Sequence, residues 1–267
     1  MIIREIECKS ILTRSGIEGV DYAVNPYVGC GHACAYCYAT FIKRFTGHSE
    51  EWGTFVDVRM NAPEVLARQL RRAKPGLVMF SSVTDAYQPL ERRYGITRGC
   101  LEVLAGYDLP VSILTKSSLV LRDLDLIRRL KNPDVAFTIT TLDEEVRKRF
   151  EPYSSPIPAR LEALAALVEA GVSTWVFCGP LLPLLSDGEA EMAALFGGIV
   201  RAGVKSILVD SLNLTGAAWG RVRTVLEEHY PQLVPHYLSL LPHRWPYHNA
   251  LMERAQQIAT RTGLAIR

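Results

Sequence analysis

The sequence predicts an α/β fold with a parallel sheet of about six strands, and two observations lead to this prediction. First, short apolar runs rich in β-branched residues recur along the chain, which is typical of parallel strands covered on both faces. Second, the segments between these runs carry apolar residues three or four positions apart, as amphipathic helices do. Strands that alternate with helices favour a parallel sheet with right-handed crossovers. Six strands are too few for a complete eight-stranded barrel, so the pattern predicts either a partial barrel or an open doubly wound sheet.

The expected elements follow one another through most of the chain. A first strand is expected around residues 22–27, and the others at 77–80, 111–114, 135–139, 174–177 and 206–209. Helices are expected at 96–104, 124–130, 144–150, 159–170 and 190–202. Gly171 and Gly203 stand directly after the last two helices, where a glycine often ends a helix. We therefore expect a barrel domain over residues 1–215 and a mostly helical C-terminal extension over residues 216–267, packed on the barrel.

Composition and charge set limits on the class of protein. The 267 residues suffice for one barrel-type domain, and 48% of them are hydrophobic and 22% charged, as in ordinary globular proteins. The formal net charge of +2 neither requires nor excludes a nucleic-acid partner, because a local basic face can hide in a near-neutral total. Arginines gather at Arg68, Arg71 and Arg72, and again at Arg128 and Arg129. We interpret both groups as solvated helix faces.

No stretch of the sequence predicts a membrane span or a signal peptide. The most apolar stretch, residues 175–185, is interrupted by Gly179, Pro180 and Pro183 and is shorter than the ~20 residues that a spanning helix needs. The first ten residues include Arg4, Glu5, Glu7 and Lys9, which a signal peptide would not carry in this arrangement. We therefore expect a cytoplasmic protein.

Three of the six cysteines crowd into one short segment, at Cys30, Cys34 and Cys37. Such a cluster in a reducing compartment indicates a metal site rather than a disulfide framework. The C-x3-C-x2-C spacing allows one compact loop to direct three thiolates at one centre, and Gly29 and Gly31 allow the backbone to turn tightly around it. A [4Fe-4S] cluster held by three thiolates keeps one iron open for another ligand. The sequence therefore predicts an iron–sulfur cluster with a free coordination position.

The alternative is a structural zinc ion, with His32 or His48 as the fourth ligand. Structural zinc sites usually combine paired C-x2-C units into a closed set of four ligands, and this sequence offers no second pair. A non-catalytic metal-binding module is therefore the weaker interpretation of the cysteines.

The cysteine motif, with the aromatic Tyr36 before its last cysteine, resembles that of the radical S-adenosylmethionine (SAM) superfamily. Other motifs resemble the spore photoproduct lyase-like branch of that superfamily. They are Asn25, Pro26, Tyr27 and Gly29; Tyr38 and Ala39; Ser82, Thr84, Asp85 and Pro89; Leu114, Thr115 and Lys116; Thr138 and Thr140; Glu151 and Pro152; and Gly179, Pro180 and Pro183. The similarity covers roughly residues 8–215. It implies a partial (β/α)6 barrel, which agrees with the strand count, and SAM bound to the open iron of the cluster.

Polar residues that follow the expected strands mark the site, because ligands of such barrels bind at the carboxyl ends of the strands. Lys116 is placed to pair with the SAM carboxylate, Thr84 and Thr138 to hydrogen-bond its ribose or amino group, and Gly179 to let the adenine approach the backbone. The resemblance implies SAM contacts for these four residues and for Tyr36. Ordinary structural roles remain open for each of them, as a strand-end lysine, β-forming threonines and a turn glycine.

The resemblance also implies which residues move hydrogen atoms. In the lyase a cysteine outside the cluster donates a hydrogen atom late in the reaction, and the matching position here is Ser82, whose O–H bond is much stronger than a thiol S–H. Cys178, at the end of an expected strand, is the candidate substitute, although a free cysteine is more often a buried small hydrophobe. Tyr36 and Tyr38 match tyrosines that help to relay the hydrogen atom in the lyase, and packing roles remain open for both.

Two further features are interpreted as structural. Glu151 and Arg160 are expected to belong to a structural ion pair. The stretch at residues 236–248 combines aromatic and basic side chains as base-stacking surfaces do, but we favour packing of its aromatic rings on the barrel.

These observations predict a radical SAM enzyme that forms a 5′-deoxyadenosyl radical and abstracts hydrogen from a substrate. A nucleic-acid lesion, and hence DNA as a partner, is the candidate that the resemblance implies. A tailoring enzyme for a small molecule or peptide is the alternative, which Ser82 favours. A one-electron donor of the flavodoxin or ferredoxin type is the expected partner. A Rossmann oxidoreductase is disfavoured because no G-x-G-x-x-G follows the first strand, and no P-loop or G-x-S-x-G elbow is present.

Overall fold

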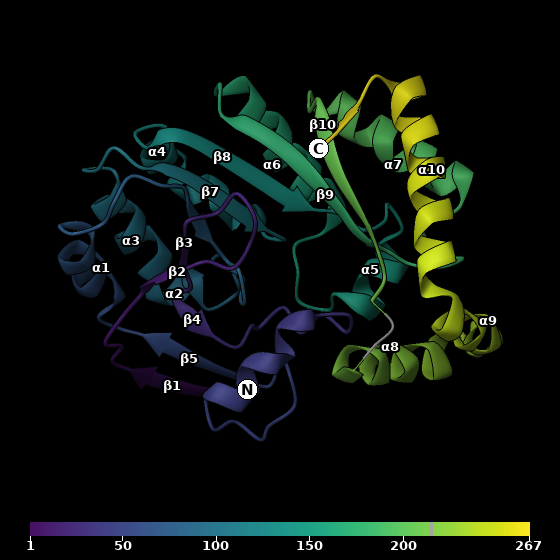
Figure 1. Ribbon diagram of the computed structural model, residues 1–267, viewed down its shortest axis with the longest axis horizontal. Helices are drawn as coiled ribbons and strands as arrows, with labels where there is room; N and C mark the ends of the chain where they lie inside the picture. The colour runs from purple at the N-terminus through teal and green to yellow at the C-terminus, as the bar shows by residue number, and fades with distance from the viewer. Residues whose placement is uncertain (214–215) are drawn as a thin grey trace.

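An eight-stranded sheet forms the centre of the computed structural model, which describes residues 1–213 and 216–267 (Figure 1). The strand order is β11-β10-β9-β8-β7-β6-β3-β2. Neighbours from β3 to β11 pair in parallel, and β2 pairs antiparallel with β3 at the edge. The strands are β2 (Leu12–Arg14), β3 (Tyr22–Val24), β6 (Val78–Phe80), β7 (Pro110–Thr115), β8 (Lys131–Thr138), β9 (Ser173–Leu181), β10 (Ser206–Ser211) and β11 (Ala265–Ile266).

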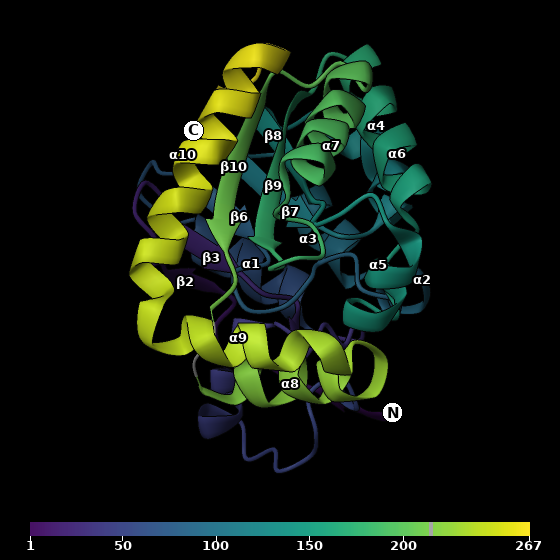
Figure 2. The same ribbon diagram turned by 90° about the vertical axis from the view of Figure 1, so that its right-hand side faces the viewer.

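The six strands expected from the sequence are confirmed as β3, β6, β7, β8, β9 and β10. They lie side by side in chain order, which is what successive right-handed crossovers produce. The parallel, curved arrangement with a helical C-terminal region is that of a partial barrel (Figures 1 and 2). Because parallel strands end at the same edge of the sheet, the segments after β6, β7, β8, β9 and β10 meet at one end of the molecule.

A second sheet of three strands was not predicted from the sequence. It consists of β1 (Ile2–Ile6), β5 (Phe55–Arg59) and β4 (Tyr27–Val28), in the order β1-β5-β4. β1 pairs parallel with β5, and β4 pairs antiparallel with it. Since β4 ends at Val28, this sheet fixes the point from which the cysteine loop departs.

Helices connect the strands and cover the outer side of the large sheet (Figure 1). They are α1 (Ala62–Leu70), α2 (Glu91–Tyr94), α3 (Ile96–Leu104), α4 (Leu124–Ile127), α5 (Glu144–Phe150), α6 (Ile157–Glu169) and α7 (Glu189–Arg201), with 3-10 helices η1 (Tyr38–Phe45) and η2 (Ser118–Asp123). α3 and α5 have the predicted bounds, and α6 and α7 begin and end within two residues of theirs. The predicted helix at residues 124–130 is too long, because β8 already begins at Lys131 and α4 ends at Ile127.

The C-terminal region folds back onto the barrel. It comprises α8 (Gly216–His229), η3 (Pro231–Leu233), α9 (Val234–Leu240), η4 (Leu241–His243) and α10 (Arg244–Thr262). α10 packs against α7 and β10, and β11 then adds a parallel strand beside β10 (Figure 2). The division expected between residues 215 and 216 touches residues 214–215, which lie outside the described residues.

The aromatic stretch of this region divides between burial and exposure. Tyr237 is fully buried, stacks on Trp219 and donates its hydroxyl to the Pro183 carbonyl at 2.8 Å. Trp245 instead leaves 66% of its surface exposed. Packing on the barrel therefore accounts for part of the stretch. None of the helices that the structure describes is both long and apolar enough to cross a membrane.

Candidate functional site

The three clustered cysteines lie on a cavity of 220 Å³ at the carboxyl ends of the parallel strands. Cys30 and Cys34 are buried and Cys37 is partly exposed. Opposite them, the cavity wall contains residues from the ends of β7, β8 and β9 and from the segment after β6. Every residue predicted for the cluster or for SAM lines this cavity, and the residues are Cys30, Cys34, Cys37, Tyr36, Thr84, Lys116, Thr138 and Gly179.

The cysteine loop is held in place by backbone contacts on both sides. Thr84 Oγ1 donates to the Gly29 carbonyl at 2.5 Å, and the Gln88 side chain accepts from the Gly31 amide at 2.7 Å. On the other side, Arg221 from α8 donates to the carbonyls of Ala35 at 3.1 Å and Cys37 at 2.7 Å. These contacts hold the backbone of the cysteine loop in place before any metal binds. Less conformational entropy is therefore lost when the loop binds a metal.

Gly29 is the position in this loop that only glycine can occupy. Its φ is +82°, and a Cβ would lie 2.5 Å from the Phe55 carbonyl oxygen. Gly29→Ala is therefore expected to lower the free energy of unfolding by about 2–4 kcal/mol, from backbone strain and the collision together. Gly47→Ala is the matched control, because Gly47 has φ +69° but nothing within 4 Å of its Cβ position. Urea unfolding of both variants checks this, and equal losses would contradict the role of the Phe55 contact.

Burial shapes the protonation of the thiols. It raises the pKa of Cys37 to about 11 and the pKa of Cys34 well above the usual value, while Lys116 opposes both shifts. Metal ligation requires thiolates, so binding a cluster at this loop would release protons.

Asp85 connects the strand ends to the cysteine loop. Its carboxylate accepts from Thr115 Oγ1 at 2.7 Å and from the Lys116 amide at 2.9 Å, and His32 Nδ1 lies 3.3 Å away. Burial alone would raise the pKa of Asp85, but His32, Thr115 and Lys116 outweigh it and lower the pKa to about 2. The carboxylate therefore stays ionised and holds the Lys116 backbone beside the loop.

The Lys116 ammonium is available to a ligand. Nζ lies 5.7 Å from the centroid of the Tyr36 ring, and within the described ranges 1–213 and 216–267 it forms no ion pair. Burial would lower the pKa of Lys116, but Cys34, Glu151 and Asp85 outweigh it and raise the pKa, so the group is charged. A free ammonium on a cavity wall fits a carboxylate such as that of SAM.

Lys116→Met is accordingly expected to weaken SAM binding. A hydrogen bond to a charged group contributes about 1.5–3 kcal/mol, which is a rise of roughly 10- to 150-fold in the Kd for SAM. Lys205→Met, at an exposed lysine remote from the cavity, should leave the Kd unchanged. Calorimetric titration of the cluster-loaded variants with SAM checks this, and an unchanged Kd in Lys116→Met would remove Lys116 from the SAM site.

The structural ion pair expected at Glu151 is present, and its partner is Arg160. Both side chains are fully buried, and Arg160 donates to the Glu151 carboxylate and to the Thr138 carbonyl, the latter at 2.9 Å. Tyr36 also donates its hydroxyl to Glu151. Burial would raise the pKa of Glu151, but Arg160 and Lys116 outweigh it and lower the pKa to about 2. This pair thus fixes Tyr36, between the second and third cysteines, to the end of β8.

The structure gives Thr84 and Gly179 roles within the protein. The Thr84 hydroxyl is engaged by the cysteine loop, so its first function is to position that loop. At Gly179 an added Cβ would lie 2.3 Å from the Phe177 ring, which itself lines the cavity. Glycine is required there for this close packing, next to the cis Gly179–Pro180 bond. Thr138 is buried on the cavity wall.

Cys178 is not on the cavity. Phe177 and Gly179 face the cavity, and since side chains alternate along a strand, the intervening thiol points the opposite way. Cys178 is fully buried in the hydrophobic core, where burial raises its pKa far above the usual value. Its sequence-based role as hydrogen-atom donor is therefore corrected, because the thiol cannot reach a substrate in the cavity.

Tyr38 and Ser82 meet at the mouth of the cavity. Tyr38 leaves 60% of its surface exposed and donates its hydroxyl to the Ser82 carbonyl. The Ser82 hydroxyl accepts from Asn25 Nδ2 at 2.9 Å. Tyr38 is thus a cavity residue with a solvent-facing ring, whereas the Tyr36 hydroxyl is committed to Glu151.

Sequence reasoning missed Trp52 and the loop-holding residues Gln88 and Arg221. Trp52 lines the cavity and is 7% exposed, and its indole N–H has no hydrogen-bond partner among the residues of the two described ranges. Such an unpaired donor fits a polar atom of a bound ligand. Trp52 belongs to no motif in the sequence, so only its tertiary position reveals it.

Zinc gains no support from the structure. Within the part of the chain that the structure describes, no three His, Cys, Asp or Glu side chains, the three loop cysteines included, lie close enough together to hold a single metal ion. The two proposed fourth ligands are also engaged elsewhere: His48 lies between Glu50 and Asp57, with both ring nitrogens 2.9 Å from a carboxylate oxygen, and His32 faces Asp85.

A partial parallel barrel whose strand ends surround a three-cysteine loop and a free ammonium defines the class of radical SAM proteins. The model of the Radical SAM superfamily matches residues 24–196, and the chain belongs to this superfamily.

The chain is similar to two proteins in sequence and to one solved structure in fold. An uncharacterized protein of Methanocaldococcus jannaschii is 33% identical over 230 residues, which are 86% of this chain and 84% of the relative. A radical SAM Nalpha-GlyT isomerase of Pseudomonas phage M6 is 24% identical over 73% of this chain and 40% of its own length. The structure of spore photoproduct lyase complexed with dinucleoside spore photoproduct superposes with a TM-score of 0.74 at 17% identity, covering 99% of this chain and 81% of the lyase. That likeness shows the same fold.

Proposed function

We propose that this protein is an enzyme that cleaves SAM reductively at a [4Fe-4S] cluster held by Cys30, Cys34 and Cys37 and abstracts hydrogen from a base of a nucleic acid. The observation that supports the proposal is that three thiols and the Lys116 ammonium line one cavity at the strand ends. When bound, the reduced cluster would supply one electron to SAM, and SAM would supply the 5′-deoxyadenosyl group that removes a hydrogen atom from the substrate.

The residues of the chain bind and orient these groups. Lys116 pairs with the SAM carboxylate, and Thr138 and Gly179 provide the wall against which SAM lies. Tyr36, fixed by Glu151, closes the cavity beside the cluster. A carrier of the flavodoxin or ferredoxin type supplies the electron.

The return of a hydrogen atom is assigned to Tyr38. Among the described residues, the thiols that line the cavity are the three of the cysteine loop, since Cys178 lies in the core. Tyr36 donates its hydroxyl to a buried carboxylate, whereas Tyr38 donates its hydroxyl to the Ser82 carbonyl and leaves its ring exposed, so Tyr38 is the candidate relay. Its O–H bond would break to give a hydrogen atom to the product radical, and the resulting tyrosyl radical would return to tyrosine with one electron from the flavodoxin- or ferredoxin-type carrier and one proton from water.

A nucleic-acid base is the proposed substrate because the fold matches a protein solved with a dinucleoside and because aromatic side chains line the cavity. Tyr38, Trp52 and Phe177 line the cavity, and aromatic rings stack on any base. Ser82 sets the chemistry apart from thymine-dimer cleavage, which needs a thiol donor, so a modification or isomerisation of the base is proposed.

The experiment measures 5′-deoxyadenosine formed by the anaerobically reconstituted enzyme with and without candidate substrates. A mixed-sequence oligodeoxynucleotide should raise its formation, and a short peptide of mixed composition should not. With deuterium on the bases, the label should appear in 5′-deoxyadenosine. Stimulation by the peptide alone would overturn the nucleic-acid proposal and favour a peptide tailoring enzyme.

A further inference from the structure

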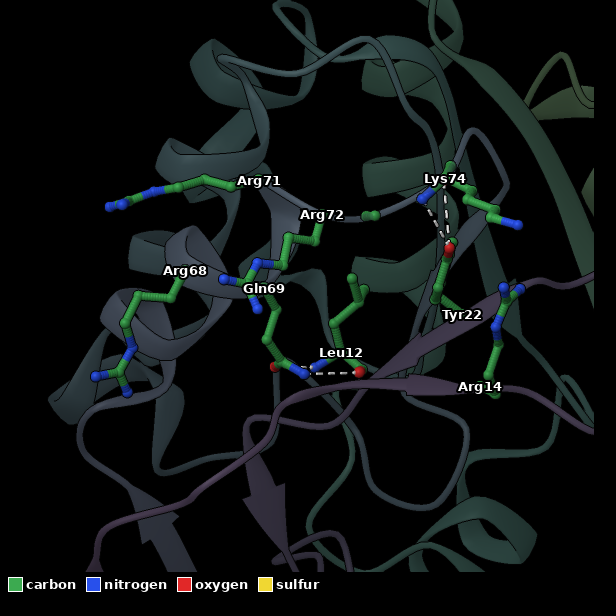
Figure 3. Close-up of a pocket in the computed structure, with 9 residues that line it drawn as sticks. Leu12, Arg14, Tyr22, Arg68, Gln69, Arg71, Arg72 and Lys74 are labelled. Carbon is green, nitrogen blue, oxygen red and sulfur yellow. Dashed lines mark hydrogen bonds between the residues drawn. The ribbon is translucent and has the colours of Figure 1, made fainter.

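A second pocket lies at the end of the barrel opposite the cysteine loop. It has a volume of 720 Å³, and five cations line it: Arg14, Arg68, Arg71, Arg72 and Lys74 (Figure 3). One wall is formed by two paired residues, Arg14 at the end of β2 and Tyr22 at the start of β3. The other wall comes from the end of α1 and the segment that precedes β6. Since the cysteine loop follows the carboxyl ends of these parallel strands, the two pockets are separate.

The charge of this pocket is not balanced by the protein. No Asp or Glu lines it, and none of its five cations takes part in an ion pair among residues 1–213 and 216–267. All five of these side chains are exposed, whereas the partly buried Arg98 and Arg122 and the buried Arg160 each contact a carboxylate at the distance of an ion pair. The excess of positive charge is therefore local, within a chain of net charge +2.

The uncharged polar groups of the pocket are already used within the protein. The Gln69 amide accepts from the Ile11 and Leu12 amides at 2.8 and 3.0 Å and donates to the Leu12 carbonyl at 3.1 Å. Tyr22 accepts from the Lys74 amide at 3.1 Å, and its ring carries the Arg14 guanidinium at 4.7 Å (Figure 3). The floor is thus rigid, and the groups left for a ligand are cationic donors, which select for negative charge.

A solvated helix face, the sequence-based interpretation of Arg68, Arg71 and Arg72, agrees with the exposure of these side chains but does not explain the pocket that they share with two other cations. Positive charge beyond the C-terminus of α1 does complement the helix dipole. Arg14 and Lys74, however, come from separate segments and face the same pocket. Figure 3 shows the charged ends of Arg68, Arg71 and Arg72 on one side and those of Arg14 and Lys74 on the other, pointing in different directions rather than meeting at one point. Spaced cations fit an extended polyanion better than a single small anion.

We propose that this pocket binds the sugar–phosphate backbone of a nucleic-acid strand, at a site separate from the SAM cavity. A guanidinium group can donate two parallel hydrogen bonds to one phosphate group, and a nucleic-acid strand presents phosphate groups at regular intervals. The proposal rests on the proposed function for the identity of the polymer and adds a second contact through which the enzyme holds it.

The test compares two double variants of the holoenzyme that lose the same charge. Arg71→Gln/Arg72→Gln removes two pocket cations, and Arg128→Gln/Arg129→Gln removes an exposed adjacent pair elsewhere. Fluorescence anisotropy measures binding of a labelled single-stranded oligodeoxynucleotide from 0.05 to 0.2 M salt. The pocket variant should bind at least about tenfold more weakly, and the slope of log K against log salt should fall by about 1.4, or 0.7 for each lost phosphate contact. The control variant should bind as the wild type does.

Equal losses in both variants, or no loss in either, would overturn the proposal. A competition arm with inorganic tripolyphosphate separates the two sources of phosphate. If tripolyphosphate displaces the oligonucleotide at equal phosphate concentration, the site takes a free polyphosphate and the nucleic-acid assignment is wrong. Formation of 5′-deoxyadenosine is measured in parallel without oligonucleotide and should be unchanged in both variants. If the wild type formed no 5′-deoxyadenosine, the proposed function would be contradicted. The binding comparison would still show whether the pocket binds nucleic acid.

Discussion

Cys34→Ala is expected to abolish the cleavage of SAM while the chain still folds. Cys34 is the middle ligand of the loop, and two thiols cannot hold three irons of a cluster in place. Loss of a partner in the outer shell of a metal site already costs 10- to 100-fold, so loss of a ligand should lower the rate of 5′-deoxyadenosine formation by more than about 100-fold. The readouts are iron content and 5′-deoxyadenosine after anaerobic reconstitution.

Cys178→Ala is the matched control for this prediction. Both thiols are buried and both substitutions remove one sulfur atom, but Cys178 faces the hydrophobic core. Its variant should keep a full cluster and the wild-type rate. Full iron content and activity in Cys34→Ala would show that the loop does not hold the cluster.

Glu151→Gln is expected to cause the largest loss of stability. The change leaves the Arg160 guanidinium, which is fully buried, without its counter-charge. Breaking a buried pair by removing one partner typically lowers the free energy of unfolding by 3–5 kcal/mol, and about that loss is expected here. Glu145→Gln is the control, since Glu145 pairs with Lys148 at the exposed surface and should change stability little. Urea unfolding of the two variants measures the difference, and equal stabilities would contradict a structural role for the pair.

The same carboxylate makes stability depend on pH in a defined direction. The pKa of Glu151 is about 2 in the folded protein and about 4.3 in an unfolded chain, so the unfolded state binds more protons between these values. The stabilisation is therefore fully present above about pH 4.3 and is lost as the pH falls toward 2. Glu151→Gln should lose less stability than the wild type over this range.

Much of the barrel could be predicted from the sequence because its strands are short apolar runs separated by periodic helices. The small sheet could not be predicted, since Ile2–Ile6 is largely exposed and Tyr27–Val28 is only two residues long. The cysteine ligands are recognisable because their spacing is local. Gln88 and Arg221 are not, because they support the loop from 57 and 184 positions away in the chain.

The position of Cys178 could have been predicted from the alternation of side chains along a strand. Gly179 and Cys178 were both assigned to the cavity, yet neighbours on one strand face opposite sides of the sheet. Once Gly179 is on the cavity, Cys178 belongs to the core. Arg14 and Lys74 illustrate the opposite case, because no sequence pattern shows that they share a pocket with Arg68, Arg71 and Arg72, which lie at and just after the end of α1.

The most direct test of the central claim is the fate of SAM on the wild-type protein. The protein is reconstituted anaerobically to about four irons per chain, reduced with dithionite and incubated with SAM. We predict 5′-deoxyadenosine and methionine in equal amounts. Intact SAM in the presence of a fully loaded and reduced cluster would contradict the account.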